Sequence, residues 1–308
     1  MIYTVTYNPA IDYVVHVRQL QAGSTNRSDQ EELYFGGKGI NVSMVLNELG
    51  IDSKALGFVA GFTGAAIENE VRQRGIAADF IRLDEGCSRI NIKIKSEMET
   101  ELNAQGPVIS ESAQQKLLNQ IETLQDGDTL VLAGSIPCSM PDDTYEKALS
   151  RLAGKQVQTI VDTAGSLLLH VLPYRPFLIK PNLQELAELF GVTLDSRAEI
   201  AHYAAKLQEQ GAKNVLVSMA GSGALLLDEY GKIHFCPGCR GTVRNSVGAG
   251  DSMVAGFLAG FLERGDYSYA LQLGSAAGGA TAFSEGLAER KLIYRMLRQL
   301  QEYSAGGS

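Results

Sequence analysis

Short β-branched runs alternate with helical patterns along much of this chain, and this alternation is the feature that most constrains its fold. The strand-like runs cover residues 55–59, 129–133, 159–162, 177–180 and 215–218, and the helical patterns cover 65–74, 142–153, 166–172, 183–190 and 198–209. Parallel strands need long connections, usually helices. The alternation therefore predicts an α/β fold with a mostly parallel sheet covered on both faces. Such sheets bind ligands beyond the carboxyl ends of their strands.

Two segments, 11–17 and 89–95, break this pattern because apolar and polar residues alternate along them. In the second, three isoleucines share one face, and Arg89, Asn91, Lys93 and Lys95 share the other. A strand buried on both faces would not carry such a polar row. We therefore predict a small sheet, solvated on one side, with strands inserted at about 11–35 and 87–107. It would cover a cleft as a lid, and an ordinary amphipathic edge strand is the alternative.

Length and composition indicate a single globular domain over residues 1–308. Lys and Arg number 27 against 35 Asp and Glu, a net charge of −8, which argues against a nucleic-acid or membrane-surface partner. No apolar run approaches the roughly 18 residues of a membrane helix. Four cysteines at this length favour the cytoplasm. We expect the terminal segment 304–308 to fray.

Glycine is enriched, with 33 residues against an average of about 7%, and its densest cluster is Gly248-Ala-Gly-Asp251. A glycine turn that opens a helix directs backbone N–H groups and the positive helix end at one point, which suits a phosphate. Asp251 beside that point can accept a proton from a hydroxyl. It can equally be an N-cap residue that stabilises its own helix, and spacing does not separate the two interpretations.

Two further glycine turns stand at 36–39, before a helical pattern at 40–49, and at 218–223, after an apolar strand. The chain contains neither a Walker A spacing nor a full Gly-x-Gly-x-x-Gly fingerprint, which argues against P-loop enzymes and nicotinamide oxidoreductases. Cys236-Pro-Gly-Cys239 has metal or redox spacing, but only His234 lies nearby as a further ligand. We predict a structural turn there.

Together these motifs resemble the PfkB (ribokinase-like) carbohydrate kinases over essentially the whole chain. The matching segments are Asn8-Pro-Ala-Ile-Asp12, Gly36-Gly-Lys-Gly-Ile-Asn-Val42, Asn182-Leu-Gln-Glu185 and Asn245-Ser-Val-Gly-Ala-Gly-Asp-Ser-Met-Val-Ala-Gly256. The resemblance implies a three-layer αβα ribokinase-like fold with a small β-sheet lid. The sequence departs from the usual family pattern at Tyr7 and Met219, where leucine is common, and neither change concerns a catalytic role.

The resemblance also implies roles on the nucleotide side. Asp251 would be the general base, and the amides of Gly248, Ala249 and Gly250 would form the anion hole for the transferred phosphate. Asn182 and Glu185 would position Mg²⁺ through water. ATP would lie along Gly250, Asn182 and the turn formed by Ser218, Met219, Ala220, Gly221, Ser222 and Gly223.

On the acceptor side, the resemblance implies that Asp12, Gly37, Lys38, Asn41 and Asn103 surround the sugar. Arg89 would hold a phosphate already present on it, since a guanidinium suits bidentate phosphate binding. The weaker candidates for that phosphate are Lys93, Ser135 and Arg27. Family members dimerise through their lids, so Arg27 would reach across from a second chain, and a solvated Arg27 is the alternative.

The expected reaction is ATP- and Mg²⁺-dependent phosphorylation of the 6-hydroxyl of fructose 1-phosphate. Tagatose 6-phosphate and fructose 6-phosphate are the alternative acceptors within the family. A sugar-phosphate sensor without catalytic activity is the alternative of another class, although it would have no need of Asp251, Asn182 and Glu185.

Overall fold

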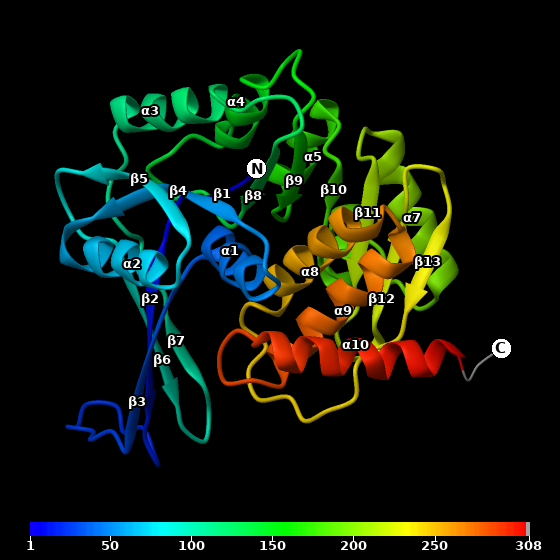
Figure 1. Ribbon diagram of the computed structural model, residues 1–308. Helices are drawn as coiled ribbons and strands as arrows, with labels where there is room; N and C mark the ends of the chain where they lie inside the picture. The colour runs from blue at the N-terminus through cyan, green and yellow to red at the C-terminus, as the bar shows by residue number, and fades with distance from the viewer. Residues whose placement is uncertain (306–308) are drawn as a thin grey trace.

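The computed structural model describes residues 1–305, so 306–308 of the predicted frayed end lie outside the described residues. Within the described chain, a nine-stranded sheet has the order β13-β12-β11-β10-β9-β8-β1-β4-β5 (Figure 1). Its strands are β1 (Ile2–Thr6), β4 (Ser53–Ala60), β5 (Ala77–Leu83), β8 (Thr129–Ala133), β9 (Gln158–Asp162), β10 (Leu178–Ile179), β11 (Asn214–Ser218), β12 (Ala224–Leu227) and β13 (Ile233–Cys236). All neighbours pair in parallel except β12, which is antiparallel to β11 and β13. The predicted mostly parallel sheet is confirmed.

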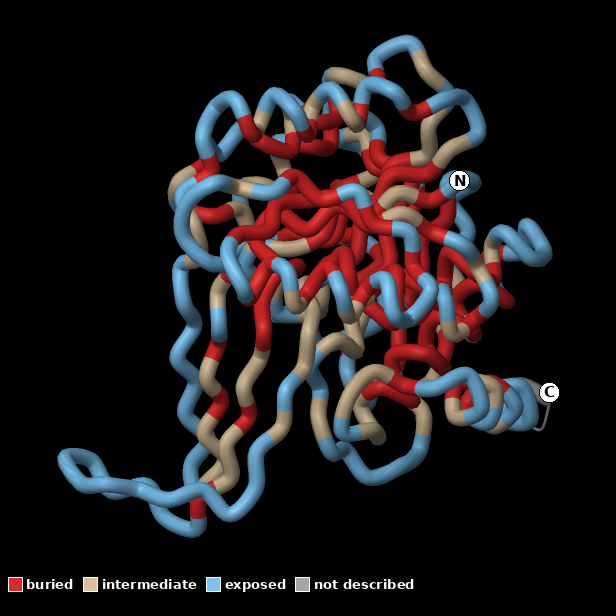
Figure 2. The backbone as a smooth tube through the Cα atoms, turned by 60° about the vertical axis from the view of Figure 1, so that its left-hand side comes forward, coloured by how far each residue is buried: buried red, intermediate tan, exposed pale blue. Residues whose placement is uncertain are grey.

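Helices cover both faces of this sheet, which makes three layers. One face carries α1 (Lys38–Glu48), α2 (Gly61–Gln73), α8 (Ala249–Arg264), α9 (Tyr267–Ala282) and α10 (Arg290–Ala305). The other face carries α3 (Glu111–Glu122), α4 (Thr144–Ser150), α5 (Ser166–Val171), α6 (Leu183–Phe190) and α7 (Arg197–Glu209). The strands are buried between them (Figure 2). Apolar side chains on both faces of the central strands explain the continuous hydrophobic runs in the sequence.

The glycines after Asp251 allow α8 and α9 to pack closely. A Cβ atom at Gly256 would lie 2.6 Å from the carbonyl oxygen of Leu273, and one at Gly260 would lie 2.9 Å from Cα of Ala270. Side chains at these positions would push the helices apart, so the glycines fix the position of α8 and of the functional residues at its start.

A second, four-stranded sheet extends away from the first, with the order β3-β2-β6-β7 (Figure 1). Its strands are β2 (Ala10–His16), β3 (Gln30–Gly36), β6 (Arg89–Lys95) and β7 (Thr100–Leu102). The predicted small sheet is therefore confirmed. Its polar row is the more buried one, because Asn91 and Lys93 contact Asp12, whereas Ile90 on the opposite face is 39% exposed.

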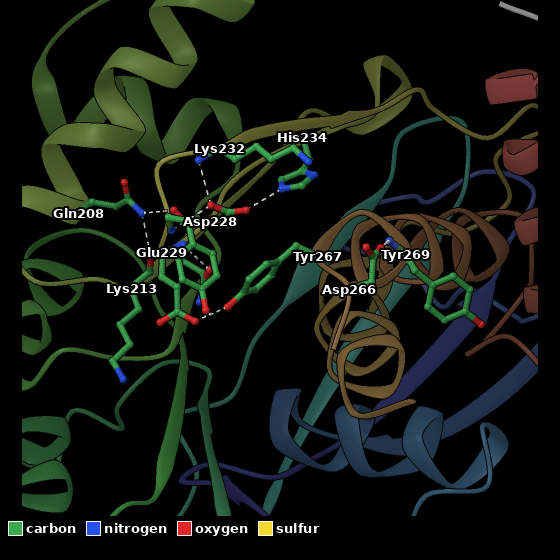
Figure 3. A network of polar contacts seen from close by, with 11 residues as sticks. Gln208, Lys213, Asp228, Glu229, Lys232, His234, Asp266, Tyr267 and Tyr269 are labelled. Atoms are coloured by element: carbon green, nitrogen blue, oxygen red, sulfur yellow. Dashed lines mark hydrogen bonds and ion pairs between the residues drawn. The ribbon is translucent and has the colours of Figure 1, made fainter. Parts of the chain in front are cut away.

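A polar network fixes the antiparallel edge of the large sheet (Figure 3). The Asp228 carboxylate lies 2.7 Å from Nε2 of His234 and accepts hydrogen bonds from the backbone N–H groups of Tyr230 and Lys232. The hydroxyl of Tyr267 donates to Glu229 at 2.5 Å and so ties the β12–β13 turn to α9. His234 is thus paired with Asp228 and serves the fold.

Among the described residues, no helix combines the length and apolarity that spanning a membrane requires.

Candidate active site

A cavity of about 400 Å³ opens at the carboxyl ends of β9, β10 and β11. Its wall is formed by Ala10, Asp12, Gly37, Lys38, Asn41, Arg89, Asn91, Asp162, Lys180, Asn182, Glu185, Ser218, Val247, Gly248, Gly250 and Asp251. A larger cavity of about 820 Å³ lies beside it, between the small sheet and the 285–289 segment. We assign the chemistry to the smaller cavity because it contains three buried charges, Asp162, Lys180 and Asp251, whereas Lys93 is the one buried charge in the wall of the larger cavity.

Asp251 lies in the first turn of α8, which begins after Gly248 in the left-handed conformation (φ 78°). Its side chain is 5% exposed, and its Oδ2 accepts a hydrogen bond of 2.8 Å from Nδ2 of Asn41. The start of α8 has no side-chain cap. Asp251 is therefore held by a neighbouring helix, and the N-cap interpretation is wrong.

Burial, followed by the nearby carboxylate of Asp162, raises the pKa of Asp251, which lies at about 6. The hydrogen bond from Asn41 and the positive charges of Lys38 and Lys180 act in the opposite direction. A carboxyl group with this pKa is mostly ionised at neutral pH and is still basic enough to accept a proton.

Two buried charges, Asp162 and Lys180, were not predicted as site residues. Oδ1 of Asp162 lies 3.3 Å from Nζ of Lys180, and its Oδ2 lies 3.7 Å from Nζ of Lys38. Burial alone would lower the pKa of Lys180, but Asp162, Asp251 and Glu185 raise it above its usual value, so the amine stays charged. Each residue ends or directly follows an apolar buried strand, which is a weak sequence signal because many ordinary strand ends share it.

Lys180 lies directly over the start of α8. A Cβ atom at Gly250 would be 3.1 Å from Nζ of Lys180, so the glycine leaves room for the amine there. Backbone N–H groups at a helix start and an adjacent ammonium group together form a site that suits a phosphate. The predicted anion hole at Gly248, Ala249 and Gly250 thus has a cation beside it.

Asn182 and Glu185 form a capping box at the start of α6. Oδ1 of Asn182 accepts the backbone N–H of Glu185 at 2.8 Å, and the Glu185 carboxylate accepts the backbone N–H of Asn182 at 2.7 Å. Both residues line the cavity. Their predicted role at a metal is therefore combined with a structural role in the helix.

The turn predicted to contact ATP begins at Ser218, which lines the cavity, and continues through Met219 and the 3₁₀ turn Ala220–Ser222. Gly223 adopts φ 101°, and a Cβ atom there would lie 2.1 Å from the carbonyl oxygen of Cys236. Gly223 is thus needed where the turn packs on the Cys236–Cys239 segment. Of the residues predicted in this turn, Ser218 alone borders the described cavity; Met219 and Gly223 are buried, and Ala220, Gly221 and Ser222 are exposed.

The cysteines of this segment, Cys236 and Cys239, are free. Burial raises the pKa of their thiols to about 11 and about 12. No group of three or more metal-binding side chains occurs among the described residues. The structural turn at this segment stays a prediction.

On the acceptor side, Asp12 is held by two residues of β6. Nδ2 of Asn91 donates to its Oδ1 at 2.8 Å, and Nζ of Lys93 lies 3.6 Å from its Oδ2. Lys93 lines the larger cavity, whereas Arg89 lines the smaller one. Nε of Arg89 donates to the backbone carbonyl of Asn8 at 3.1 Å. Burial lowers the pKa of Arg89, whereas the negative charge of Asp12 acts to raise it. An arginine remains charged in either case.

Three predicted acceptor residues, Asn103, Ser135 and Arg27, are exposed and lie outside the wall of the cavity. Asn103 follows the last residue of β7, and Ser135 follows Gly134, a neighbour of the Lys38 side chain. Arg27 lies in the loop that joins β2 to β3 at the far end of the small sheet (Figure 1). A single chain therefore does not bring Arg27 to its own cavity.

The sequence model described as pfkB family carbohydrate kinase matches residues 5–292. The chain belongs to this family. Members of the pfkB family use ATP to phosphorylate an alcohol group, so the protein is a phosphotransferase.

The relatives of this pfkB kinase span nearly its full length. A protein named 1-phosphofructokinase from Bacillus subtilis is 46% identical, over 98% of this chain and 99% of its own. A protein named D-tagatose-1-phosphate kinase from Bacillus licheniformis is 41% identical over the same shares. The crystal structure of a putative phosphofructokinase from Staphylococcus aureus is 41% identical, with a TM-score of 0.86 over 97% of each chain. The predicted ribokinase-like fold is thus confirmed.

Proposed function

We propose that this kinase transfers the γ-phosphoryl group of ATP to the 6-hydroxyl of fructose 1-phosphate, giving fructose 1,6-bisphosphate and ADP. The observation that carries the proposal is that one cavity contains a buried carboxylate, Asp251, and a half-buried arginine, Arg89. The first suits a hydroxyl that must lose a proton, and the second suits a phosphate already on the substrate. The name of the Bacillus subtilis relative supports fructose 1-phosphate as that substrate.

In this mechanism the 6-oxygen forms the new P–O bond, the bond to the β-phosphate oxygen of ADP breaks, and the hydroxyl proton passes to Asp251. Lys180 and the N–H groups at the start of α8 stabilise charge on the transferred group, since positioning and electrostatics carry most of a phosphoryl transfer. Asn41 orients the carboxylate through its hydrogen bond. Asp12 binds sugar hydroxyls together with Gly37 and Lys38 of the same cavity wall, and Asn103, outside that wall, joins them when substrate is bound.

The donor set fits Mg²⁺. Mg²⁺ takes oxygen ligands and keeps several of its waters, so one carboxylate and one amide oxygen at the cavity wall, from Glu185 and Asn182, are the kind of ligands it uses. When bound there with ATP, the ion would neutralise phosphate charge. The capping box fixes the orientation of both side chains before ATP arrives.

A second acceptor, tagatose 1-phosphate, is favoured by the name of the Bacillus licheniformis relative. It differs from fructose 1-phosphate in configuration at one carbon, so the same Arg89 and Asp251 serve both. The two 6-phosphate sugars place the phosphate at the opposite end and expose a different hydroxyl to Asp251.

Steady-state kinetics with the four ketose phosphates and Mg-ATP test the proposal. We expect the highest kcat/KM for fructose 1-phosphate. A higher value for tagatose 1-phosphate would reassign the substrate. A higher value for either 6-phosphate sugar would reject the proposed orientation, in which the 1-phosphate lies at Arg89 and the 6-hydroxyl at Asp251. The absence of sugar-dependent ATP turnover would favour a sensor.

We further propose that two copies associate through their small sheets. The face of this sheet opposite Asp12 carries exposed apolar side chains, with Leu33 57% and Leu102 56% exposed. Pairing of two such faces would remove this surface from water and would let Arg27 approach the partner's cavity. The free cysteines agree with a cytoplasmic location, which we also propose.

A further inference from the structure

The connections between the two sheets converge on the end of β1 and on residues 7–9, which link β1 to β2. Gly37, which links β3 to α1, is so close that a Cβ atom there would lie 2.5 Å from Cγ2 of Thr6 and 3.3 Å from Cα of Pro9. Arg89, which opens β6, and Gln105, which follows β7, both bond to Asn8. Any tilt of the small sheet against the large one must therefore change the surroundings of this segment.

Asn8 makes these contacts with two different groups. Its side chain is 8% exposed, and Nδ2 donates to the backbone carbonyl of Gln105 at 2.9 Å. Gly106 adopts φ 87°, and a Cβ atom there would lie 2.4 Å from Oδ1 of Asn8, so the amide group is enclosed on that side. Its backbone carbonyl accepts the hydrogen bond from Nε of Arg89.

The bond to Asn8 decides how Arg89 presents its guanidinium group. Nε–H is committed to the carbonyl, and the Nη atoms carry the remaining donors of a planar fork. Because Arg89 lines the cavity with Asp12 and Asp251, the plane of the Asn8 peptide sets the plane of that fork. A bidentate contact to phosphate depends strongly on that orientation.

We propose that Asn8 is a positioning residue for the phosphorylated substrate. Its side chain anchors the segment that returns from the small sheet, its carbonyl anchors Arg89, and the two bonds together hold the Arg89 fork toward the cavity. The proposal rests on the role of Arg89 as the phosphate ligand. An amide is required because the side chain must donate to the Gln105 carbonyl. An aspartate has the same shape but, when ionised, no donor.

The test compares Asn8→Ala and Asn8→Asp with the unchanged enzyme, measuring KM for fructose 1-phosphate, KM for ATP and kcat. We expect the KM for fructose 1-phosphate to rise about fivefold in both variants, the factor that corresponds to about 1 kcal/mol for one net hydrogen bond. KM for ATP and kcat should stay within about twofold of their native values, because the change lies on the side of the site that binds the phosphorylated sugar. Asn47→Ala is the matched control, since Nδ2 of Asn47 also donates to a backbone carbonyl, that of Arg74, away from the cavity.

The same substitutions in an Arg89→Ala background separate two claims: that Arg89 binds the substrate phosphate, and that Asn8 positions Arg89. If Asn8 acts through Arg89, Asn8→Ala adds no further rise in KM there. An Arg89→Ala enzyme with unchanged KM would remove the phosphate ligand and the positioning role with it. If Arg89→Ala raises KM, the positioning role alone is rejected by any of three results: unchanged KM in Asn8→Ala, normal KM in Asn8→Asp, or additive effects in the double variant.

Gly106→Ala provides a second route if Asn8→Ala does not fold. The added Cβ presses on the Asn8 amide from the other side and leaves Asn8 itself intact. It should raise KM for fructose 1-phosphate selectively, as Asn8→Ala does. Equal rises in the KM values of both substrates would overturn the proposal.

Discussion

Replacement of Asn41 by leucine is expected to move the acidic limb of the pH–kcat/KM profile to higher pH. Asn41 donates to Oδ2 of Asp251 at 2.8 Å and so stabilises the ionised form of the base. Leucine has a similar volume and no donor. The variant therefore removes one contribution to the pKa of Asp251 while the burial of the carboxylate is largely kept.

The size of the shift follows from the strength of that bond. A hydrogen bond to a charged group contributes about 1.5–3 kcal/mol, and one pKa unit corresponds to about 1.4 kcal/mol, so the limb should rise by roughly 1–2 pH units. The native enzyme starts from a pKa of about 6. Its kcat/KM should fall about tenfold for each pH unit well below that value, because only the ionised base accepts the proton.

The assay measures kcat/KM for fructose 1-phosphate from pH 5 to pH 9, in the native enzyme and in Asn41→Leu. The phosphate of the substrate also titrates near pH 6 and changes kcat/KM by about the same factor in both enzymes. The comparison therefore uses the pH at which the acidic limb lies in each enzyme, and the absolute value of kcat/KM is not compared. An acidic limb at the same pH in both enzymes would refute the assignment of this limb to Asp251.

Three further predictions concern stability and assembly. Asp251→Asn should unfold at a higher temperature than the native protein at pH 8, because burial raises the folded-state pKa of Asp251 to about 6 and its ionised form therefore opposes folding. Thermal scans should show this difference shrinking as pH falls from 6 towards 4; a constant difference would contradict the linkage. Gly223→Ala should lose about 2 kcal/mol or more of stability in urea titrations and should raise the KM for ATP. The reason is that residue 223 adopts φ 101° and its Cβ would clash with the carbonyl oxygen of Cys236. A urea midpoint and a KM equal to the native values would argue against this packing. Leu33→Lys with Leu102→Lys should reduce the mass measured by light scattering to that of one chain, and an unchanged mass would reject association through this face.

Several features of the fold and site were predictable because their signals are local. The alternation in 89–95 matches β6 residue for residue, and the glycine turn before Asp251 opens α8 as expected. The helix predicted at 65–74 begins four residues earlier, at Gly61, since Gly61-Phe-Thr-Gly64 is typical of a loop in isolation. Tertiary packing decides such boundaries: Thr63 is fully buried and bonds to Ser88.

Other features depend on contacts between distant residues and could not be predicted in this way. The polar face of β6 is buried because Asn91 reaches Asp12, 79 residues away in sequence. Asp162 gains its importance only where β9 ends beside Lys180 and Lys38. Many polar residues follow apolar strands, so the position alone did not distinguish these two from ordinary strand ends.

The central claim, that Asp251 is the base in phosphorylation of a sugar phosphate, is tested most directly by the kcat of Asp251→Asn with Mg-ATP and fructose 1-phosphate. Asparagine keeps the shape and can still contact Asn41, but it cannot accept the hydroxyl proton. We predict that kcat falls by about 10²–10⁴-fold, the usual contribution of a general base, while the dissociation constant for ATP stays near its native value. A kcat within a few-fold of the native enzyme would contradict the account.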